Sequence, residues 1–483
     1  MKEMKTLNGY EIVDGKARAE IDLIKGVYVT PEMFGAVGDG VADDTEAVQS
    51  CLDGDIQTVF ATKTYKITRP LLLTKSKTIT GGGTFYAPSS DKRFYMFTRY
   101  EPFDEPISYF EVNNIHFESV REHECARTIV GDFVDGSLYS NVTFISLRNY
   151  DSVYIKNTTF KNADCALFLD SCNNVVVDGF KSLYSTQTVY AQGNNKITIT
   201  NGYSEFYDLV HTSAHHIYIC YGNDDVLIDG VKMINPNHAG EYPVHVYASA
   251  DQIADYGLTR KVAVRNCYIE HGNKTIASAM VSEKFEMDSC VCKCLDETKN
   301  GGFYYCDIEG YRPIYEIRNT TFTHCAGFRL DGIMTGNVGD LKFTNCKIEG
   351  VVRGYADMTE TIEFDNCQML QLHIEETTTP SPILVKNCSI IHPSNYALRI
   401  RDAIPIKLVN CYLHANYGDG VIAVQNVGAD VTLIGCYGEN DGGTKFEYNG
   451  SHAPTVKVYN CTFPTLTLRR PADFIEKNNV WAE

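Results

Sequence analysis

Six short segments in the last third of the chain share one pattern of apolar and polar residues. They are LKFTNC, IEFDNC, ILVKNC, IKLVNC, VTLIGC and VKVYNC. Alternation at period two is typical of a β-strand with one buried face. The segments close at Cys346, Cys367, Cys388, Cys411, Cys436 and Cys461, so successive copies lie 21, 21, 23, 25 and 25 residues apart. A period of this size indicates stacked structural repeats.

A repeat of about 22 residues holds three short strands and three turns but no helix. Each coil must then pair with the coils above and below it, about 4.8 Å away, which predicts an all-β parallel β-helix. Asparagine tolerates left-handed backbone dihedrals and can turn the chain, while the cysteine that follows it points inward as a small apolar residue. The pattern therefore predicts internal ladders of stacked residues, with Asn at the bend and Cys inside.

Less regular copies of the pattern occur earlier in the chain. We place their ladder positions at Asp178, Asn201, Asp229, Asn266, Ser289 and Asn319, which gives coils of 23, 28, 37, 23 and 30 residues. The longest coil exceeds a minimal one by about 15 residues, and we expect loop insertions at about 203–216 and 232–260. Insertions in repeat arrays gather on one face, where binding occurs.

The amino-terminal residues differ from the repeat. Residues 29–55 predict a cap segment, because Asp43 or Asp44 can start a short amphipathic helix over Thr45 to Leu52. The open end of a β-helix exposes unpaired strand edges and needs such a cover. Residues 1–28 are interpreted as an attachment or oligomerisation leader, with a disordered leader as the alternative. Residues 56–483 then form the β-helix.

Composition narrows the classes of partner. The chain has 43 Lys and Arg against 61 Asp and Glu, a formal net charge of −18, which argues against nucleic acid as a partner. No apolar run has membrane-spanning length, so we expect no membrane insertion, and the start MKEMKTL predicts no signal peptide. The 17 cysteines are regularly spaced and odd in number, which favours free buried thiols over disulfides. The segment CVCKC has the wrong spacing for zinc, so we expect no metal and no cofactor.

The cap segment carries a resemblance to a known family. FGAVGDGVADDTEAVQ, residues 34–49, resembles the opening motif of the pectate-lyase-like right-handed parallel β-helix superfamily, which includes many bacteriophage tailspikes. GYEIVDGKAR, residues 9–18, resembles leader segments of phage tail proteins. The resemblance implies a right-handed β-helix that works on carbohydrate, commonly as a homotrimer. It also implies a virion tail protein that is made in the host cytoplasm, acts extracellularly and attaches to the tail or baseplate through its leader.

A second strand precedes the ladder strand in each coil, and its outward residues form a column of candidate substrate-binding groups. They are Tyr218, His245, Tyr247, Arg329, Asp331, Arg353, Tyr355, His373, Glu375, Arg399 and Arg401. In the family, this strand face is the usual polysaccharide cleft. Aromatic and hydrogen-bonding groups suit sugars, and the arginines suit an acidic glycan. A solvated face with ion pairs between coils is the alternative.

Two pairs of carboxyl groups are candidates for catalysis of glycoside hydrolysis. Asp331 and Glu375 lie two coils apart in the column, which fits the separation of an inverting pair. Asp208 and Glu241 lie in the insertions beside a cluster of histidines that includes His211 and His238, two further substrate-binding candidates. We favour the second pair, because long loops carry specificity.

Two motifs of the superfamily's enzymes bear on the mechanism. Asn162-Ala163-Asp164 matches the Asn-x-Asp of the polygalacturonase branch, but that branch's Gly-His-Gly and Arg-x-Lys are absent from the chain. The Arg-x-Pro-x-x-Arg signature of pectate lyases is absent as well. Asp164 is therefore kept as a minor catalytic candidate, and neither branch is favoured.

The leading hypothesis is therefore a tailspike-like, endo-acting depolymerase that hydrolyses a bacterial surface polysaccharide. A non-catalytic receptor-binding tail protein, a β-helix polysaccharide lyase and a bacterial carbohydrate enzyme outside any virion are the alternatives. The fold alone does not decide between them.

Overall fold

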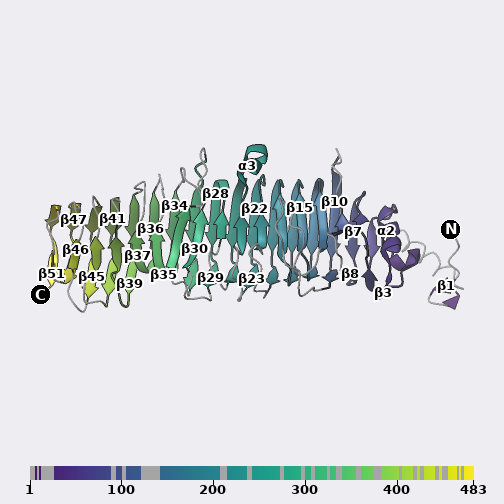
Figure 1. Ribbon diagram of the computed structural model, residues 1–483, viewed down its shortest axis with the longest axis horizontal. Coiled ribbons are helices and arrows are strands. Elements are labelled where there is room, and N and C mark those ends of the chain that lie inside the picture. The colour runs from purple at the N-terminus through teal and green to yellow at the C-terminus, as the bar shows by residue number, and fades with distance from the viewer. Residues whose placement is uncertain are drawn as a thin grey trace. The chain divides into compact units, whose positions relative to one another are not determined.

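The computed structural model describes most of the 483 residues. The described ranges are 6–7, 10–11, 27–88, 94–99, 105–120, 142–206, 215–235, 242–271, 277–294, 300–305, 311–323, 327–332, 340–354, 361–374, 382–401, 405–416, 421–424, 429–440, 445–448, 455–464, 467–468 and 473–482. They form two compact units, residues 1–185 and residues 186–483. In each unit, strands from successive coils lie side by side and pair in parallel (Figure 1). Both units are right-handed parallel β-helices, as predicted.

Each coil contributes a ladder strand that ends at the bend. In the first unit these are β4 (Thr58–Phe60), β7 (Lys77–Thr80), β10 (Ile107–Asn113), β13 (Tyr150–Lys156) and β16 (Asn174–Asp178). In the second unit they are β19 (Lys196–Thr200), β22 (Asp225–Asp229), β25 (Thr259–Arg265), β28 (Val281–Asp288), β31 (Ile314–Arg318), β34 (Leu341–Thr344), β36 (Ile362–Asp365), β38 (Ile383–Lys386), β41 (Pro405–Val409), β44 (Asp430–Ile434), β47 (Thr455–Tyr459) and β50 (Asp473–Lys477).

A post-bend strand follows each ladder strand. The first unit has β5 (Thr64–Lys66), β8 (Thr84–Ala87), β11 (His116–Ser119), β14 (Thr159–Lys161) and β17 (Lys181–Leu183). The second unit has β20 (Tyr203–Glu205), β23 (Lys232–Asn235), β26 (Tyr268–His271), β29 (Val291–Cys294), β32 (Thr321–Thr323), β35 (Lys347–Gly354), β37 (Gln368–Ile374), β39 (Ser389–His392), β42 (Tyr412–Ala415), β45 (Tyr437–Asn440), β48 (Thr462–Pro464) and β51 (Val480–Ala482).

A face strand completes most coils. The first unit has β6 (Leu71–Leu72), β9 (Phe94–Thr98), β12 (Val142–Arg148) and β15 (Cys165–Asp170). The second unit has β18 (Gln187–Gln192), β21 (His215–Ile219), β24 (Val244–Val246), β27 (Ala277–Ala279), β30 (Asn300–Tyr305), β33 (Gly327–Gly332), β40 (Leu398–Ile400), β43 (Ile422–Val424), β46 (Lys445–Tyr448) and β49 (Thr467–Leu468), while β35 and β37 continue into this position. The short strands β1 (Thr6–Leu7) and β2 (Tyr10–Glu11) pair antiparallel.

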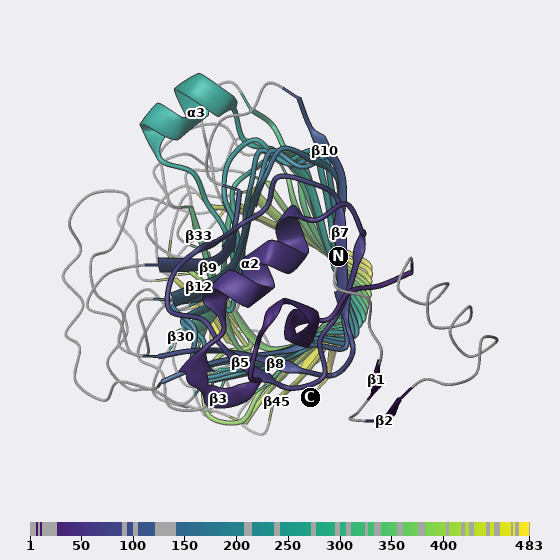
Figure 2. The same ribbon diagram turned by 90° about the vertical axis from the view of Figure 1, so that its right-hand side faces the viewer.

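The cap helix has formed where it was predicted. α2 (Thr45–Asp53) follows the 3-10 turn η1 (Pro31–Phe34) and the strand β3 (Asp39–Asp43), and it lies across the end of the first unit (Figure 2). Its buried residues are Thr45, Ala47, Val48, Cys51 and Leu52, so the helix is amphipathic, as predicted. The buried Lys77 of β7 donates from Nζ to the carbonyls of Gly54 at 2.6 Å and Ile56 at 2.7 Å, beyond the end of the helix. These bonds tie α2 to the first ladder strands.

Asparagine turns the chain at the bend, as predicted. The φ angles of Asn157, Asn201, Asn266, Asn319, Asn345, Asn366, Asn387, Asn410 and Asn460 all lie between 49° and 54°, in the left-handed region. Their side chains stack on the outer side of the bend, where the Nδ2 of Asn366 donates to Oδ1 of Asn345 at 2.8 Å. The ladder positions placed at Asp178 and Asp229 are wrong by one residue, because Gly179 and Gly230 hold the positive φ angles. Glycine adopts this conformation at no steric cost, whereas aspartate does not.

The bend predicts the behaviour of two substitutions. Asn366→Ala is expected to lower the free energy of unfolding by about 1–2 kcal/mol, because alanine is strained at positive φ and cannot bond to Asn345. Asn366→Gly also removes the hydrogen bond to Asn345, but glycine adopts the positive φ angle without strain. The glycine variant should therefore lose less stability than the alanine variant. Urea denaturation of the two variants checks the order, and a glycine variant that is the less stable of the two would contradict it.

Cysteine forms the inner ladder. All 14 described cysteines are buried and free, including the six that close the repeats of the last third. Cys388 Sγ accepts from the backbone N–H of Cys367 at 3.3 Å, and the same contact joins Cys461 to Cys436. Burial raises the pKa of Cys51 and of Cys172 to about 12, so these two thiols stay protonated at neutral pH. The cysteines therefore act as small apolar packing residues.

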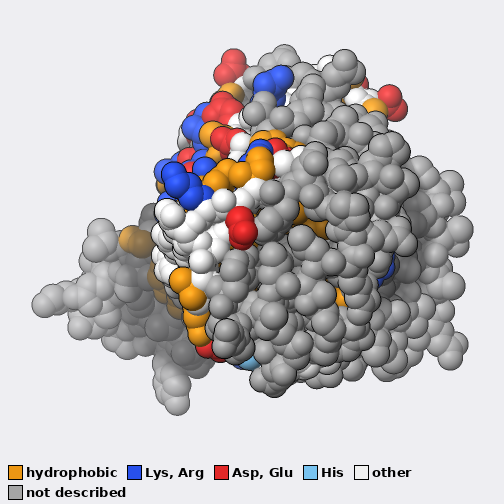
Figure 3. Space-filling model, turned by 90° about the vertical axis from the view of Figure 1, so that its left-hand side faces the viewer, with side chains coloured by type: hydrophobic (Ala, Val, Ile, Leu, Met, Phe, Trp, Pro, Cys, Tyr) orange, Lys and Arg blue, Asp and Glu red, His pale blue; other side chains and the backbone are white. Residues whose placement is uncertain are grey.

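Ion pairs join the coils on the outer side of the ladder strands. Glu286 of β28 accepts from Arg265 at 2.8 Å and from Arg318 at 3.1 Å, and Lys284 bonds Glu316 at 2.8 Å. Basic and acidic side chains are seen together on one flank of the described surface in Figure 3. The described helices include none long and apolar enough to cross a membrane.

Candidate functional site

Three face strands of the second unit carry a cluster of aromatic and imidazole rings. β18, β21 and β24 pair in parallel, and their register sets Tyr190 opposite Tyr218 and Tyr218 opposite His245. The rings of Tyr218 and His245 stack at 4.8 Å with an interplanar angle of 10°, and Tyr190 meets Tyr218 edge-on at 4.9 Å. The alternation of the sequence thus predicted the alignment of Tyr218 with His245. We call Tyr190, His215, Tyr218, Tyr242, His245 and Tyr247 the aromatic face.

His245 is the centre of the aromatic face. Ring centroids lie 4.3 Å away for His215, 4.9 Å for Tyr242 and 5.3 Å for Tyr247. The side chain is 7% exposed, whereas Tyr218 and Tyr247 are partly exposed. His245 lies in the predicted column, but the surrounding rings cover most of its side chain, which the sequence pattern did not predict. The tyrosines form the accessible part of the surface.

Hydrogen bonds hold the two histidines of the aromatic face. Nδ1 of His215 lies 3.0 Å from the backbone carbonyl oxygen of Tyr242, and Nε2 of His215 lies 3.1 Å from Nδ1 of His245. The pKa of His245 lies well below its usual range, first because burial disfavours the charged ring, and second because a protonated His215 would repel it. His245 is therefore neutral at pH 7.

The pKa of His245 predicts that acid destabilises the protein. The folded-state pKa lies below the value of 6.5 for a free histidine, so the unfolded chain binds the proton more tightly. The contribution of His245 to the free energy of unfolding is then fully present above pH 6.5. It falls as the pH drops below that value, by up to about 1.4 kcal/mol per pH unit. Urea denaturation at pH 7.5 and pH 5.5 measures this loss. His245→Asn should reduce the loss, and the exposed His116→Asn should not; equal losses in all three proteins would contradict the prediction.

The helix α3 (Ala250–Tyr256) extends the aromatic surface. It follows β24 directly, begins with a capping box of Ser249 and Gln252, and projects from the strands of its unit (Figures 1 and 2). Tyr256, at its end, is 62% exposed and stacks on Tyr221 at 4.6 Å with an interplanar angle of 22°. Tyr221 and Tyr247 both pack against the buried cluster of Ala248, Leu258 and Met280. Tyr247 of the aromatic face and Tyr221, the stacking partner of Tyr256, therefore share one buried support.

Further face strands carry the arginines of the predicted column, Arg329, Arg353, Arg399 and Arg401, which we call the arginine column. The register sets Arg329 opposite Arg353, Arg353 opposite His373 and His373 opposite Arg399. His373 is 4% exposed, so its expected place on an open face is wrong. Side chains on adjacent coils are only about 4.8 Å apart, and the ring is packed among its neighbours. Arg399 and Arg401 are partly exposed.

Most of the carboxyl candidates lie outside the described residues. These are Asp208, Glu241 and Glu375, together with His211, His238 and Tyr355. Asp331 lies on β33 opposite Tyr304 of β30, but its side chain, like those of Arg329 and Arg353, is outside the description. The structure therefore tests neither carboxyl pair. Among the described residues, no group of His, Cys, Asp and Glu side chains is arranged to hold a metal ion.

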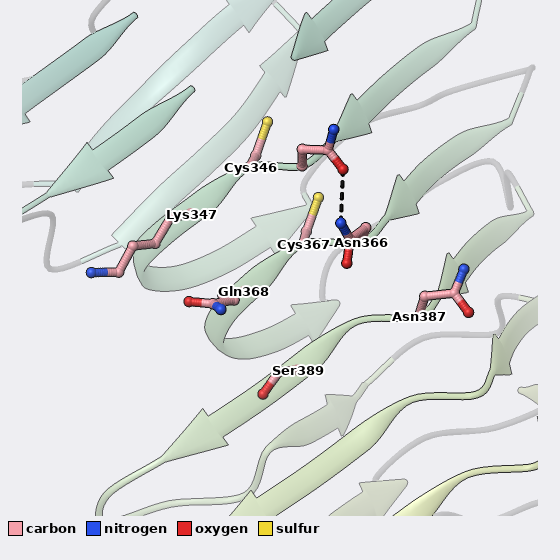
Figure 4. A pocket seen from close by; sticks show the side chains of 8 residues that line it. Cys346, Lys347, Asn366, Cys367, Gln368, Asn387 and Ser389 are labelled. Carbon is pink, nitrogen blue, oxygen red and sulfur yellow. Dashed lines mark hydrogen bonds between the residues drawn. The ribbon is translucent and has the colours of Figure 1, made fainter. Parts of the chain in front are cut away.

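Two hollows lie on a different surface, at the bend of the second unit. One of about 330 Å³ is lined by the amides of Asn345, Asn366 and Asn387, with Gln368 and Ser389 beside them (Figure 4). The next, of about 490 Å³, is lined by residues that include Met369 and Ile391. The ladder amides of Asn345 and Asn366 already bond one another. Regular stacking accounts for these hollows, and they contain none of the predicted site residues.

Several residues of the aromatic face could not be selected from the sequence. His215 was visible only as one of several clustered histidines, and Tyr190 only as a member of a face strand. Tyr242 contributes a backbone carbonyl, which leaves no mark in the sequence. Tyr256 belongs to an insertion, where the repeat pattern that aligned Tyr218 with His245 does not apply.

Residues 312–464 match the family model described as a right handed beta helix region, which agrees with the observed coils. No curated protein matches the chain. Solved structures to which this chain is similar include tailspike protein 3 of bacteriophage CBA120, with 8% identity, a TM-score of 0.36 and coverage of 97% of this chain. This chain spans 64% of that tailspike.

Two further solved structures are similar to the same extent. The tailspike protein gp49 of Pseudomonas phage LKA1 has 12% identity and a TM-score of 0.33, with 92% of this chain and 83% of that chain covered. The catalytic unit of an alpha-1,3-glucanase from Streptomyces thermodiastaticus has 12% identity and a TM-score of 0.37, with 94% and 70% covered. Likenesses this low do not indicate what this chain binds.

Proposed function

We propose that the protein binds a bacterial surface polysaccharide on the aromatic face. The observation that carries the proposal is the contiguous set of rings on β18, β21 and β24, from Tyr190 through Tyr218 and His245 to Tyr247. Each tyrosine offers an apolar ring for the C–H face of a sugar and a hydroxyl for its polar groups. The coil spacing of about 4.8 Å repeats this surface from strand to strand, along the β-helix axis, which suits a linear polymer.

We further propose that the protein hydrolyses the bound polysaccharide as an endo-acting glycosidase. Glycoside hydrolysis uses one carboxyl group as acid and a second as base or nucleophile. Glu241 directly precedes Tyr242 in the chain, and Asp208 lies in the segment that leads into β21, so this pair remains our first choice. Asp331 and Glu375, on the face strands of later coils, remain the second choice.

The test is the release of new reducing ends from a panel of bacterial capsular and cell-wall polysaccharides. Wild type is compared with Asp208→Asn, Glu241→Gln, Asp331→Asn and Glu375→Gln, each checked for its far-ultraviolet circular dichroism and unfolding midpoint. We expect activity to vanish in Asp208→Asn and Glu241→Gln and to persist in the other two variants. The reverse result would move catalysis to the second pair.

A non-catalytic receptor-binding tail protein is the second candidate. It is favoured by one observation: within the described residues, the ring and hydrogen-bond contacts of His245, at the centre of the aromatic face, are all with tyrosines and a histidine and none with a carboxyl group. Tight binding without new reducing ends, on a panel that contains the host's own glycan, would overturn the hydrolase proposal and support this one. A lyase product, recognised by the ultraviolet absorbance of its new double bond, would overturn both.

We propose that the protein acts as a homotrimer in a phage tail, attached through residues 1–28. The resemblance of residues 9–18 and 34–49 to tail proteins supports this proposal. Light scattering of the full chain should then report about three times the chain mass of 54.0 kDa. A mass equal to one chain at micromolar concentration would contradict it.

A further inference from the structure

The hydrogen bonds of the aromatic face determine where its histidines carry their protons. A backbone carbonyl oxygen can only accept, so Nδ1 of His215 donates to the carbonyl of Tyr242 at 3.0 Å. A neutral imidazole has one N–H, which leaves Nε2 of His215 as an acceptor. Nδ1 of His245, 3.1 Å away, must then be the donor to it. The chain of bonds therefore leaves Nε2 of His245 with a free lone pair.

The Nε2 atom of His245 has no hydrogen-bond partner within the described part of the chain, and only 7% of the residue's surface is exposed. One face of the ring is covered by Tyr218, stacked at 4.8 Å. Nε2 of His245 is not one of the fully buried, unpaired side-chain atoms of the described residues, so the atom can be reached from the surface of the aromatic face. An acceptor that is reachable and has no partner among the described residues is a second observation, independent of the stacking, that points to a ligand.

We infer that His215 positions His245 as a hydrogen-bond acceptor for a hydroxyl of the bound sugar, so that the aromatic face selects a neutral, hydroxyl-bearing sugar unit. The inference rests on the proposed function. The lone pair of neutral His245 accepts from an O–H donor, whereas a carboxylate or sulfate at the same place would bring lone pairs and negative charge against it and has no proton to donate. The arginine column, on other coils, is the part of the chain that suits an acidic unit.

The same bonds make recognition depend on pH. The titratable groups in contact with His245 are His215, Tyr218, Tyr242 and Tyr247. When the pair of histidines takes up one proton, both nitrogens of one ring become donors. The chain of hydrogen bonds then no longer leaves a free lone pair on Nε2 of His245. Binding of a hydroxyl to His245 is then expected to weaken as the pH falls well below the usual histidine pKa of about 6.5, while stacking on the tyrosines is unaffected.

The proton positions can be measured without any ligand. In the full chain with ¹⁵N-labelled histidine at pH 7.5, long-range nitrogen–proton spectra should show His215 and His245 protonated at Nδ1. His215→Phe should shift His245 to the Nε2–H form that free imidazole prefers, and His215→Gln, whose amide oxygen can accept from Nδ1–H, should restore the Nδ1–H form. An Nε2–H form of His245 in the wild type would overturn the inference. Unfolding midpoints of each variant show whether the fold is kept.

Paired sugar probes test the selectivity. Glucose, galactose and mannose are compared with glucuronate, galacturonate and mannuronate, with shifts of the His245 nitrogens as the measure of binding. We expect at least one neutral sugar to bind at least tenfold more tightly than its uronate at pH 7.5, and to lose that advantage at pH 5. Tighter binding by the uronates, or no shift of His245 with any of the six, would overturn the inference.

The failure of the inference can be told apart from the failure of the proposed function. His245→Phe keeps an aromatic ring in the cluster but removes the acceptor, so it should lose the preference for the neutral sugar and its pH dependence while it still binds the polysaccharide weakly. If no polysaccharide of the panel binds the wild type, the proposed function fails. The nitrogen spectra then still decide whether His215 positions His245.

Discussion

Tyr218→Ala is expected to weaken polysaccharide binding about 10- to 100-fold, the loss of a central binding residue worth about 1.4–2.7 kcal/mol. Tyr218 stacks on His245 at 4.8 Å and contacts Tyr190 at 4.9 Å and His215 at 5.0 Å, so it links all three face strands. Alanine removes the ring that a sugar would contact and also uncovers His245. Calorimetric titration with the tightest-binding polysaccharide of the panel measures the loss of affinity.

Two control variants separate the aromatic face from general surface effects. Tyr218→Phe keeps the ring, and its affinity should fall by less than that of the alanine variant. Tyr437→Ala removes a tyrosine that is 44% exposed and stacked on Tyr412 at 5.8 Å, with the same chemistry but on the post-bend strands. It should bind as the wild type does. If Tyr437→Ala loses as much affinity as Tyr218→Ala, the binding surface is not the aromatic face.

The repeat made the coil architecture predictable because its chemistry is local. An asparagine that must adopt positive φ leaves a mark at one position, and the cysteine that follows it leaves another. The prediction failed by one residue at Asp178 and Asp229, where the next residue, Gly179 or Gly230, performs the same turn. Two residue types satisfy one backbone requirement, and the alternation of the preceding strand cannot say which of two adjacent residues provides it.

The candidate site was predictable only in part, for a physical reason. Period-two alternation on strands that pair in register predicts which side chains share a column, and it aligned Tyr218 with His245 and His373 with Arg399. Alternation says nothing about how far neighbouring rings cover one another, so the burial of His245 and His373 was not foreseen. The relay through the carbonyl of Tyr242 depends on the course of the backbone, which no residue type specifies.

The stability of the first unit depends on a stack of phenylalanines inside its coils. Phe117 of β11 is 1% exposed, and its ring lies 5.8 Å from Phe85, 5.6 Å from Phe144 and 5.6 Å from Phe160. Phe85 and Phe160 belong to the coils before and after it, since β11 pairs with both β8 and β14. A single ring therefore contributes to the packing of three successive coils.

Phe117→Ala is expected to lower the free energy of unfolding of the first unit by about 3–5 kcal/mol, through lost apolar burial and the cavity left between coils. Phe117→Leu fills most of that space and should cost less, because leucine keeps an apolar side chain in the stack. Phe60→Ala, at a site that is 38% exposed in the same unit, should cost about 1 kcal/mol or less. Denaturant unfolding of the three variants gives the order, and a Phe60 variant as damaging as the Phe117 variant would refute the role of the stack.

The effect of Phe117→Ala should also be local, because each coil of a repeat protein contacts only its neighbours. Amide hydrogen exchange is then expected to accelerate in β8, β11 and β14, whose rings lose a partner. The strands β36 and β38 of the second unit should exchange as in the wild type, and Tyr218 should still bind the polysaccharide. Faster exchange throughout the chain would mean that both units unfold as one cooperative body, and the binding surface would then depend on packing far from it in sequence.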